Sequence, residues 1–410
     1  MTATDEDRPD PHRLPVIFIL LTVMIDAMGI GLIVPVMPDL IRDVGGGTLA
    51  EAAIWGGILS TTFAVMQFLF GPVVGGVSDS YGRRPVLLVA LVVMALDYVL
   101  MAVASTLWLL LLGRVIGGIT AATQSTATAY MADISRPEER AARFGLVGAA
   151  FGAGFVLGPL LGGLVAELGT RAPFWLAAAL ALSNAAFGWL VLHETVTDSI
   201  RRPFSWARSN PLGALKSLGR LPGLRTLLLV YFIYYVQFAV YPAVWSYFGI
   251  ARFDWTPATI GLSLALFGMM MAVIQGGLIR PVLAALGERG TVIAGHGFSI
   301  VSLAAIAVIP SGLWVLILTP LAAFGGIIPP ALQGMMSARV GDDAQGELQG
   351  ALTSASALAM ILSPLVMTWT FARFTETGAP VYLPGAPFLL AAALSIAGLG
   401  VVLGTARRRA

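Results

Sequence analysis

The chain has 410 residues, of which 57% are hydrophobic and 11% are charged, and its mean hydropathy is +0.86 at a formal net charge of +2. A soluble domain carries about 25% charged residues, so this composition excludes a soluble domain and places most of the chain in lipid. The sequence has no cysteine, which excludes disulfides and thiol chemistry, and its three histidines argue against a histidine-built metal site.

Apolar runs long enough to cross a bilayer recur along the whole chain. A helix needs about 20 residues to cross the hydrocarbon core, and runs of that order lie at 14–37, 54–77, 85–105, 107–131, 142–167, 172–193, 224–248, 257–281, 290–310, 312–336, 346–371 and 385–404. They lack the alternation and the short length of barrel strands, and backbone groups in lipid must be hydrogen-bonded internally. The sequence therefore predicts an all-α membrane protein with twelve transmembrane helices.

A polar segment divides these spans into two groups of six. Residues 145–159 and 350–364, which both begin with glycine and end with proline, lie about half the chain apart, as do Leu107-Trp108 and Leu313-Trp314. Such a repeat is typical of transporters whose binding site lies between two halves near the membrane midplane.

The predicted domains are an N-terminal six-helix bundle at 1–193, a cytoplasmic linker loop at 194–223 and a C-terminal six-helix bundle at 224–410, related by pseudo-symmetry. The linker mixes basic and apolar residues, so we expect it to lie on the inner membrane surface. A regulatory partner site is the alternative for this loop.

Lys and Arg residues divide unequally between the two sides of the predicted spans. If both termini are cytoplasmic, 19 of the 24 Lys and Arg residues fall in inner segments. The exceptions are Arg42, Arg171, Arg252 and Arg373 in outer loops and Arg114 within a span. Because cytoplasmic loops carry the excess of positive charge, the sequence predicts a multi-pass protein of the bacterial inner membrane with both termini inside.

A charged loop joins the second and third spans and reads Gly75-Gly76-Val77-Ser78-Asp79-Ser80-Tyr81-Gly82-Arg83-Arg84. The pattern Gly-x-x-x-Asp-x-x-Gly-Arg-Arg resembles the loop between helices 2 and 3 of the major facilitator superfamily of transporters, with Ser80 where that family usually has Arg or Lys. The resemblance implies that Asp79 pairs with Arg83 and that these residues, with Asp133 at the end of the fourth span, gate the inner face. The alternative is that the arginines only keep the loop inside.

The fifth span is crowded with glycine. Its string Gly-Pro-x-x-Gly-Gly, at 158–163, resembles the antiporter motif of the superfamily's drug exporters, which implies a gating role for Gly158 and Pro159. The alternative is ordinary close packing, since small residues let helix backbones approach.

Three ionisable residues lie within the spans: Asp26, Asp97 and Arg114. A charge at a helix centre costs ~2.5–3.5 kcal/mol on insertion scales, so such groups are rarely idle. Asp97 and Arg114 are each eight residues from the hairpin at 105–106, roughly 12 Å deep at the helical rise, and so they can meet. We expect the three to form a cluster that takes up and releases a proton. A static Asp97–Arg114 pair that only holds two helices together is the alternative.

Polar and aromatic side chains at membrane depth suit a cavity for a flat amphipathic molecule, although packing or an interfacial belt is the alternative for each. The candidate substrate-binding residues are Tyr98, Gln124, Tyr234, Gln237, Tyr241, Gln275, His296 and Gln333.

Within the superfamily the chain resembles the tetracycline/proton antiporters. The segments that carry the resemblance are 26–38, 78–88, 95–98, 112–114, 252–255, 330–334 and 348–350. That family expels a tetracycline–divalent cation complex in exchange for a proton, and the resemblance implies that Asp26, Asp97 and Arg114 fall where its functional charges lie.

The chain departs from that family at two positions of the C-terminal half. Well-known members carry an acid in helix 9 and a histidine in helix 8, where this chain has Ser299 and Met271. Helix 9 here offers only His296, one turn earlier, and whether it replaces the acid is left open.

The sequence therefore predicts a proton-coupled antiporter that exports an amphipathic drug-like compound by alternating access, with tetracycline or a related compound as the leading substrate. No nucleophile, metal cluster or phosphate loop is recognisable, so we expect no enzymatic activity, no catalytic residue, no metal site and no cofactor. The expected partners are the small-molecule substrate, protons and the lipid bilayer, without nucleic acid, and we expect a monomer. The alternatives are a proton symporter for a sugar or organic acid, an exporter of a different drug or metabolite, and a transporter-like receptor or scaffold.

Overall fold

The computed structural model describes residues 13–121, 123–198, 201–206, 209–210, 222–341 and 344–407. Within these ranges, eleven helical runs are long and apolar enough to cross a membrane. One run, Pro257–Val308, contains two spans, because the chain reverses at Gly287, whose φ of 66° lies in the left-handed region. Counted separately, these two segments give the predicted twelve spans of an all-α membrane protein.

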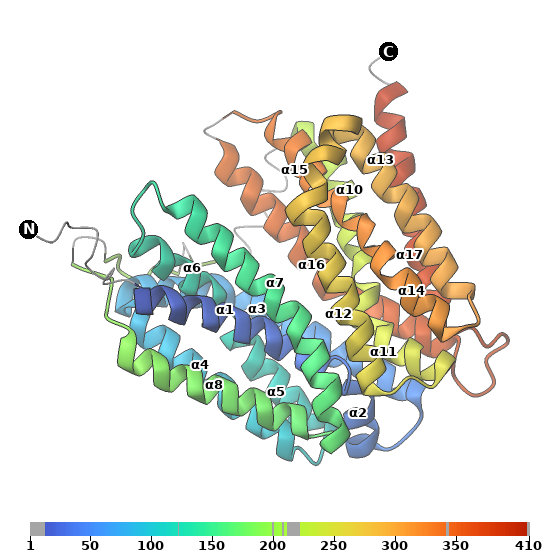
Figure 1. Ribbon diagram of the computed structural model, residues 1–410, viewed down its shortest axis with the longest axis horizontal. Helices are drawn as coiled ribbons and strands as arrows, with labels where there is room; N and C mark the ends of the chain where they lie inside the picture. Colours follow the sequence, from blue (N-terminus) through green and yellow to red (C-terminus); the bar gives the residue numbers. More distant parts are fainter. Residues whose placement is uncertain are drawn as a thin grey trace, which may run out of the picture.

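The helices form two bundles (Figure 1). The N-terminal bundle consists of α1 (Arg13–Ile33), α2 (Met37–Gly45), α3 (Leu49–Tyr81), α4 (Arg83–Val103), α5 (Leu107–Thr120), α6 (Thr123–Asp133), α7 (Arg140–Val165) and α8 (Ala172–Val191). The C-terminal bundle consists of α10 (Arg225–Phe238), α11 (Val240–Phe253), α12 (Pro257–Val273), η4 (Ile274–Leu278), α13 (Ile279–Val308), α14 (Gly312–Ala322), η5 (Ala323–Ile327), α15 (Ile328–Ser337), α16 (Gln345–Arg373) and α17 (Ala386–Arg407).

Several spans begin at side chains that satisfy the free amide groups of a helix end. Thr48 and Glu51 form a reciprocal capping box at the start of α3, and the Thr106 hydroxyl accepts from the Leu109 amide at the start of α5. The capping box extends the second span five residues before the apolar run predicted at 54–77.

Several of these long runs, each of which matches a predicted span, contain an internal irregularity. The fourth span consists of α5 and α6, the seventh of α10 and α11, and the tenth of α14, the 3₁₀ helix η5 and α15. In the tenth span the break follows from composition, because Pro320 has no amide hydrogen and Gly325-Gly326 is flexible.

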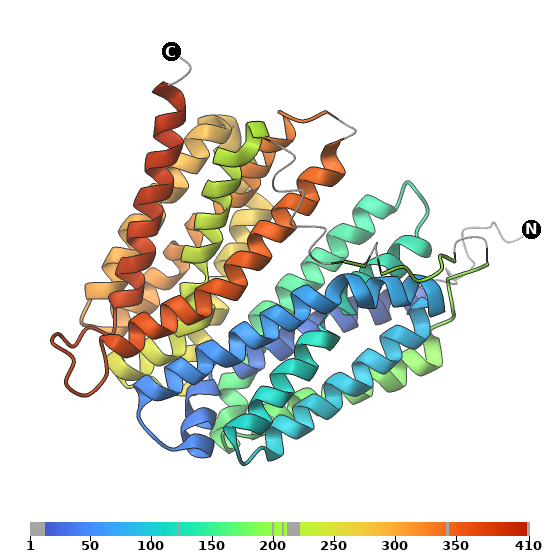
Figure 2. The ribbon, with the colours of Figure 1, turned by 180° about the vertical axis from the view of Figure 1, so that it is seen from behind.

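The two bundles meet at one end and separate toward the other (Figures 1 and 2). At the closed end, near α2 and α11, α3 packs on α16 and α7 packs on α12: Gly57 contacts Thr368, and Gly163 contacts the Pro257 carbonyl. At the open end, a Cβ added to Gly75 of α3 or to Gly148 of α7 would meet no atom within 4 Å. The open end is the one at which α1 begins and α17 ends (Figure 1).

Candidate functional site

The three predicted membrane charges lie inside the N-terminal bundle on different helices. Asp97 on α4 is only 2% exposed, and its Oδ2 atom is 3.8 Å from the Arg114 Nη2 atom on α5. Glycines make room for this acid: a Cβ on Gly113 or Gly117 would come within 2.8 or 2.7 Å of a carboxylate oxygen. The two residues that the sequence places at equal depth are therefore side by side, at the contact of α4 with α5.

Asp26 on α1 is the third membrane charge, and it is linked to the Asp97–Arg114 pair through Tyr98. Its Oδ1 atom is buried and has no hydrogen-bond partner among the described residues. Tyr98, whose hydroxyl contacts Gly29 one turn further along α1, lies within electrostatic range of Asp26, Asp97 and Arg114. Tyr98, a predicted substrate-binding residue, is buried between α4 and α1 beside the charges, and its contact with substrate stays a prediction.

A buried hydrogen bond near Asp26 was missed by the sequence analysis. The Asn184 amide of α8 donates to the Thr22 hydroxyl of α1 over 2.8 Å, one turn before Asp26. A single amide in the otherwise apolar run of α8 was the signal that could have found it, because a buried polar group requires a partner.

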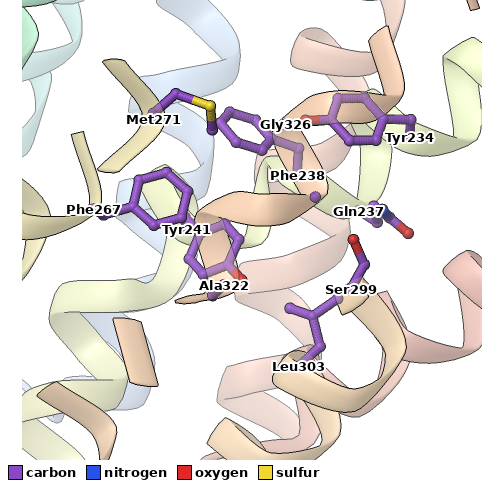
Figure 3. Close-up of a pocket in the computed structure, with 11 residues that line it drawn as sticks. Tyr234, Gln237, Phe238, Tyr241, Phe267, Met271, Ser299, Leu303, Ala322 and Gly326 are labelled. Carbon is purple, nitrogen blue, oxygen red and sulfur yellow. The ribbon is translucent and has the colours of Figure 1, made fainter. Parts of the chain in front are cut away.

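The C-terminal bundle holds a small aromatic pocket (Figure 3). Three predicted substrate-binding residues, Tyr234, Gln237 and Tyr241, line it. The other lining residues are Phe238, Phe267, Met271, Ser299, Leu303, Ala322, Gly325 and Gly326. The free space is about 10 Å³, near the room that one water molecule needs. The pocket is therefore too small, as it stands, for a drug-sized molecule.

Met271 and Ser299 line this same pocket. At these two positions the resemblance implies a histidine and an acid, whereas neither side chain of this chain is charged. Among the described residues that line the pocket, Gln237 carries the one side-chain amide; it is 2% exposed, and its Oε1 atom has no hydrogen-bond partner in the part of the chain that the structure describes.

The other predicted substrate-binding residues are dispersed. His296 is fully buried and faces α17, where its Nδ1 atom is 2.9 Å from the Ser395 hydroxyl. His296 does not line the aromatic pocket, whereas Ser299, three residues later on α13, does, so the substrate-binding role of His296 stays a prediction. Gln333 of α15 donates to the Tyr231 hydroxyl over 3.4 Å.

Two predicted amides are exposed in the structure. Gln124 lies on α6, and Gln275 lies in the π-helical turn η4. Gln275 thus follows α12, whose Gly268 packs against Val156 of α7.

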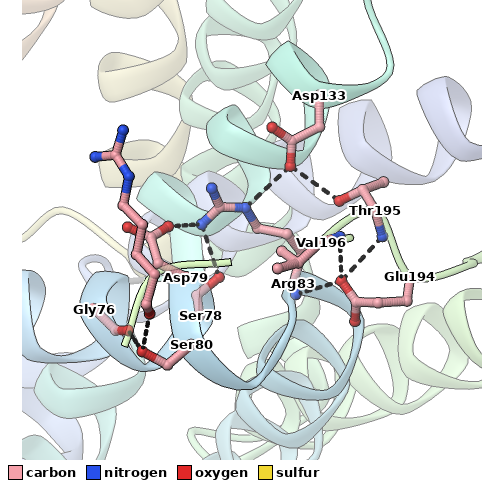
Figure 4. A network of polar contacts seen from close by, with 10 residues as sticks. Gly76, Ser78, Asp79, Ser80, Arg83, Asp133, Glu194, Thr195 and Val196 are labelled. Atoms are coloured by element: carbon pink, nitrogen blue, oxygen red, sulfur yellow. Dashed lines mark hydrogen bonds and ion pairs between the residues drawn. The ribbon is translucent and has the colours of Figure 1, made fainter. Parts of the chain in front are cut away.

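At the open end, the predicted gating residues form one network (Figure 4). The Arg83 guanidinium pairs with Asp79, and its Nε atom donates to Asp133 Oδ2 over 3.2 Å. The Thr195 hydroxyl donates to the same Asp133 oxygen over 3.0 Å. The structure thus brings together the three residues whose gating role the resemblance implies.

Glu194 also belongs to this network and was missed, because it was assigned to the linker. Its carboxylate accepts from the amides of Arg83, at 2.9 Å, and Arg84, at 3.2 Å, the first residues of α4. A carboxylate at a helix N-terminus satisfies free amides and interacts favourably with the helix dipole. Glu194 therefore fixes the start of the helix that carries Arg83.

Ser80, the residue at which the loop departs from the superfamily pattern, holds the linker. Its hydroxyl donates to the Arg202 carbonyl over 2.6 Å, and the Arg202 amide donates to the Asp79 carbonyl over 3.3 Å. The described part of the linker thus lies along the C-terminal turns of α3, and Trp206 stays largely exposed. Much of the predicted linker, 211–221, lies outside the described residues.

The two residues of the antiporter-like string lie where three helices meet. A Cβ on Gly158 of α7 would come within 2.6 Å of the Met28 carbonyl oxygen of α1, and the Pro159 carbonyl contacts Gly261 of α12. These positions couple the interior of the N-terminal bundle to the contact between the bundles.

Outside the spans, one acid of α2 lies at the closed end. Asp39 is partly buried and 3.7 Å from Arg42. Burial raises the pKa of the Asp39 carboxyl above its usual 3.8, Arg42 opposes that rise, and Asp43 adds to it.

Comparison with known proteins places this site in a family. Residues 19–364 match the model of the Major Facilitator Superfamily. The chain is 40% identical over 381 residues to a tetracycline resistance protein, class C, of Escherichia coli, covering 91% of this chain and 96% of that protein. It is 41% identical over 360 residues to the class G protein of Vibrio anguillarum, covering 87% of this chain and 90% of that protein.

Solved structures agree on the fold. The human organic anion transporter MFSD10 superimposes with a TM-score of 0.70 at 26% identity over 96% of this chain and 100% of that one. A bacterial homologue of the human lysosomal transporter Spinster, in an inward-facing and occupied conformation, gives 0.76 at 15% identity over 98% of both chains. This chain therefore belongs to the Major Facilitator Superfamily and, within it, to the family of the tetracycline resistance proteins.

Proposed function

We propose that the protein is a proton-coupled antiporter that exports tetracycline, or a related amphipathic compound, by alternating access. The observation that carries the proposal is the buried cluster of Asp26, Asp97 and Arg114 in a chain that is 40% identical to a tetracycline resistance protein. Charges inside a membrane protein are retained where they serve transport, and this cluster contains two acids but only one base.

The coupling step uses the excess acid. When Asp26 or Asp97 releases its proton, the carboxylate gains attraction for Arg114 or for a cationic substrate complex, and this attraction is strong where water is scarce. When the acid takes up a proton, that attraction is lost and the substrate is released. One proton that crosses 100 mV supplies ~2.3 kcal/mol, which corresponds to more than a tenfold substrate gradient.

The substrate site lies between the bundles in this proposal. The aromatic pocket has free space of only about 10 Å³, so we assign its tyrosines and Gln237 to the wall of the site. The exposed amides of Gln124 and Gln275 are available to the compound itself. A tetracycline would enter as its divalent-cation chelate, so the metal would be cargo.

The arrangement of the bundles suggests the orientation. The open end carries Arg83 and the start of α10 at Arg225. Because Lys and Arg collect on the cytoplasmic side of a bacterial inner membrane, we assign the open end and both termini to the cytoplasm. We also take a monomer as the working unit. The structure would then be the inward-open state.

The test is drug-driven proton movement in inverted vesicles. Vesicles that contain the protein and a pH-sensitive dye are acidified, and tetracycline with magnesium is added. Proton release that requires Asp26 supports the proposal. Silence with every compound of a drug panel, or a pH dependence of opposite sign with a sugar or organic acid, would contradict it.

A different exported compound is the second candidate, and one observation favours it. The pocket positions Met271 and Ser299 are uncharged where the resembling exporters carry a histidine and an acid. A response to another amphipathic drug with silence for tetracycline would support this candidate and retain the antiport mechanism.

A further inference from the structure

Arg114 of α5 is held by side chains of two other helices of the N-terminal bundle and not by its acid alone. Its guanidinium carbon is 5.5 Å from the centroid of the Phe63 ring on α3. Its Nη2 atom contacts the Met101 sulfur on α4 and is 3.8 Å from Asp97 Oδ2. The cation therefore stands between an aromatic face and a carboxylate.

The ion pair of Arg114 with Asp97 is incomplete. A charge-assisted N–H···O bond is about 2.7–2.9 Å long, well below the separation found here. Asp97 Oδ1 and Arg114 Nε are both buried without a hydrogen-bond partner among the described residues. An aromatic face attracts a desolvated guanidinium strongly, so Phe63 competes with the carboxylate for it.

Glycines of α5 let Phe63 reach this position. A Cβ on Gly118 would lie 2.6 Å from the Phe63 carbonyl oxygen, and one on Gly117 would lie 3.6 Å from the Phe63 ring. Small residues permit this close approach of two helix backbones. The close packing of α3 on α5 therefore places the Phe63 backbone next to α5, with the ring beside Gly117.

The same stretch of α3 touches the other bundle. The Thr61 hydroxyl, two residues before Phe63, donates to the Ile361 carbonyl of α16 over 2.9 Å. A change in the contact between the bundles would thus shift the ring next to Arg114.

We infer that Phe63 is a positioning residue of the coupling cluster: its ring holds Arg114 short of a full ion pair with Asp97 and so sets the pH at which Asp97 exchanges its proton. The inference rests on the proposed function only in taking Asp97 as a proton-exchanging group. It also assigns Phe63 the link between the α3–α16 contact and the charges.

Few other ionisable groups face Asp97. Of the helices that pack against α4, α5 carries only Arg114 and α8 carries none, while those of α3 and α6 (Glu51, Asp79, Tyr81, Tyr130 and Asp133) lie toward the helix ends. On α4 itself Tyr98 is adjacent, and through it Asp26 of α1. The Arg114 position is therefore the main variable in the electrostatics of Asp97.

The test is an infrared pH titration of the purified full-length protein. The carbonyl stretch of protonated Asp97 is identified by subtracting the spectrum of Asp97→Asn. Phe63→Leu, and separately a polyfluorinated phenylalanine at position 63 that keeps the ring shape but not its negative face, are compared with the wild type. Phe63→Tyr, which keeps the face, and Phe70→Leu, two turns further along α3, are the controls.

Loss of the aromatic face should let Arg114 move closer to Asp97 and stabilise its carboxylate. The midpoint pH of the band of protonated Asp97 should then fall by about one unit, which is a tenfold rise in the proton concentration needed. The fluorinated ring should shift in the same direction, and both controls should titrate as the wild type. Unchanged midpoints in Phe63→Leu and in the fluorinated protein, or an equal shift in Phe70→Leu, would overturn the inference. The titration needs no substrate, so its failure is separable from a failure of drug export.

Discussion

At the scale of single residues, the two buried acids differ in what their removal leaves behind. Asp97 has Arg114 at 3.8 Å, whereas the buried Asp26 oxygen has no hydrogen-bond partner among the described residues. Removing one partner of a buried ion pair leaves an uncompensated charge and costs about 3–5 kcal/mol. Removing an unpartnered acid leaves no such charge.

We therefore expect Asp26→Asn to fold as well as the wild type but to lose coupled transport. Asp97→Asn should lose transport and also unfold at a lower temperature in detergent. The measurements are drug-driven proton movement in vesicles and thermal unfolding of the purified variants. Full activity of Asp26→Asn would remove Asp26 from the mechanism, and equal stability of Asp97→Asn would show that Arg114 does not depend on Asp97.

Asp39, which lies outside the membrane spans, should make the stability of the protein depend on pH. Because burial raises the pKa of this carboxyl in the folded protein above 3.8, the folded state binds the proton more tightly than the unfolded state. The contribution of Asp39 to stability therefore falls as pH rises through the interval from 3.8 to the raised folded pKa. Asp39→Asn should match the wild type below this interval and be more stable above it. Thermal unfolding against pH checks this, and Asp43→Asn is the matched control; a constant difference at all pH values would contradict it.

Counting residues along helices was enough to predict that Asp97 and Arg114 meet, because the helical rise fixes depth. It could not predict that Tyr98 joins the charges or that His296 faces α17. Those placements depend on helix rotation within a bundle, and spans that are apolar on all sides carry little signal of which face turns inward.

At the scale of elements, α7 has glycines on two faces, one packed against α1 and one without contacts in this state. Gly154 and Gly158 lie against the backbone of α1, whereas Gly148 and Gly152 have no atom within 4 Å of an added Cβ. Gly152 lies about three turns before Gly163 and so on the same face, which contacts α12 at the closed end, and Gly148 lies one turn before Gly152, close to that face. The uncontacted glycines are therefore the surface on which α12 can close in the alternate state.

Gly148→Leu should fold normally but slow transport at least tenfold, since the added side chain obstructs closure of the open end. Gly158→Leu should fail to fold, because its side chain would collide with the α1 backbone. Gly400→Leu is the control, since Gly400 of α17 also has open space around it but lies away from the contact between bundles. Membrane protein level and transport rate are measured; normal transport by Gly148→Leu would show that this face does not close.

The crowding of glycines in α7 could be recognised from sequence, but the division of labour between its faces could not, because both faces consist of the same residue. The polar network of Asp79, Arg83, Asp133 and Glu194 at the open end was likewise only partly predictable. Asp79, Arg83 and Asp133 followed from the motif, whereas Glu194 and the Ser80–Arg202 contact are long-range pairings that no local pattern encodes.

At the scale of the whole molecule, twelve spans in two bundles followed from hydropathy and repeat spacing, because the bilayer constrains helix length. Which end of the molecule is open did not follow. Alternate packings of one sequence can differ by only a few kcal/mol, and both use the same apolar faces. Among the described residues, few polar contacts join the bundles at the closed end; one is the hydrogen bond from the Ser246 hydroxyl to the Val34 carbonyl, at 2.8 Å. Few such bonds must break when this end opens.

A disulfide between α3 and α16 would lock the closed end. The chain contains no cysteine, so an introduced pair has no competing thiol. A Cβ on Gly57 of α3 would lie 3.2 Å from the Thr368 Cβ of α16, close to the 3.5–4.5 Å separation of disulfides. Oxidation of the double variant Gly57→Cys/Thr368→Cys should form the bridge and stop transport, and reduction should restore it, while each single variant should transport under both conditions. Transport that persists in fully cross-linked protein would mean that α3 and α16 stay together throughout the cycle, and that alternating access does not proceed by opening this end.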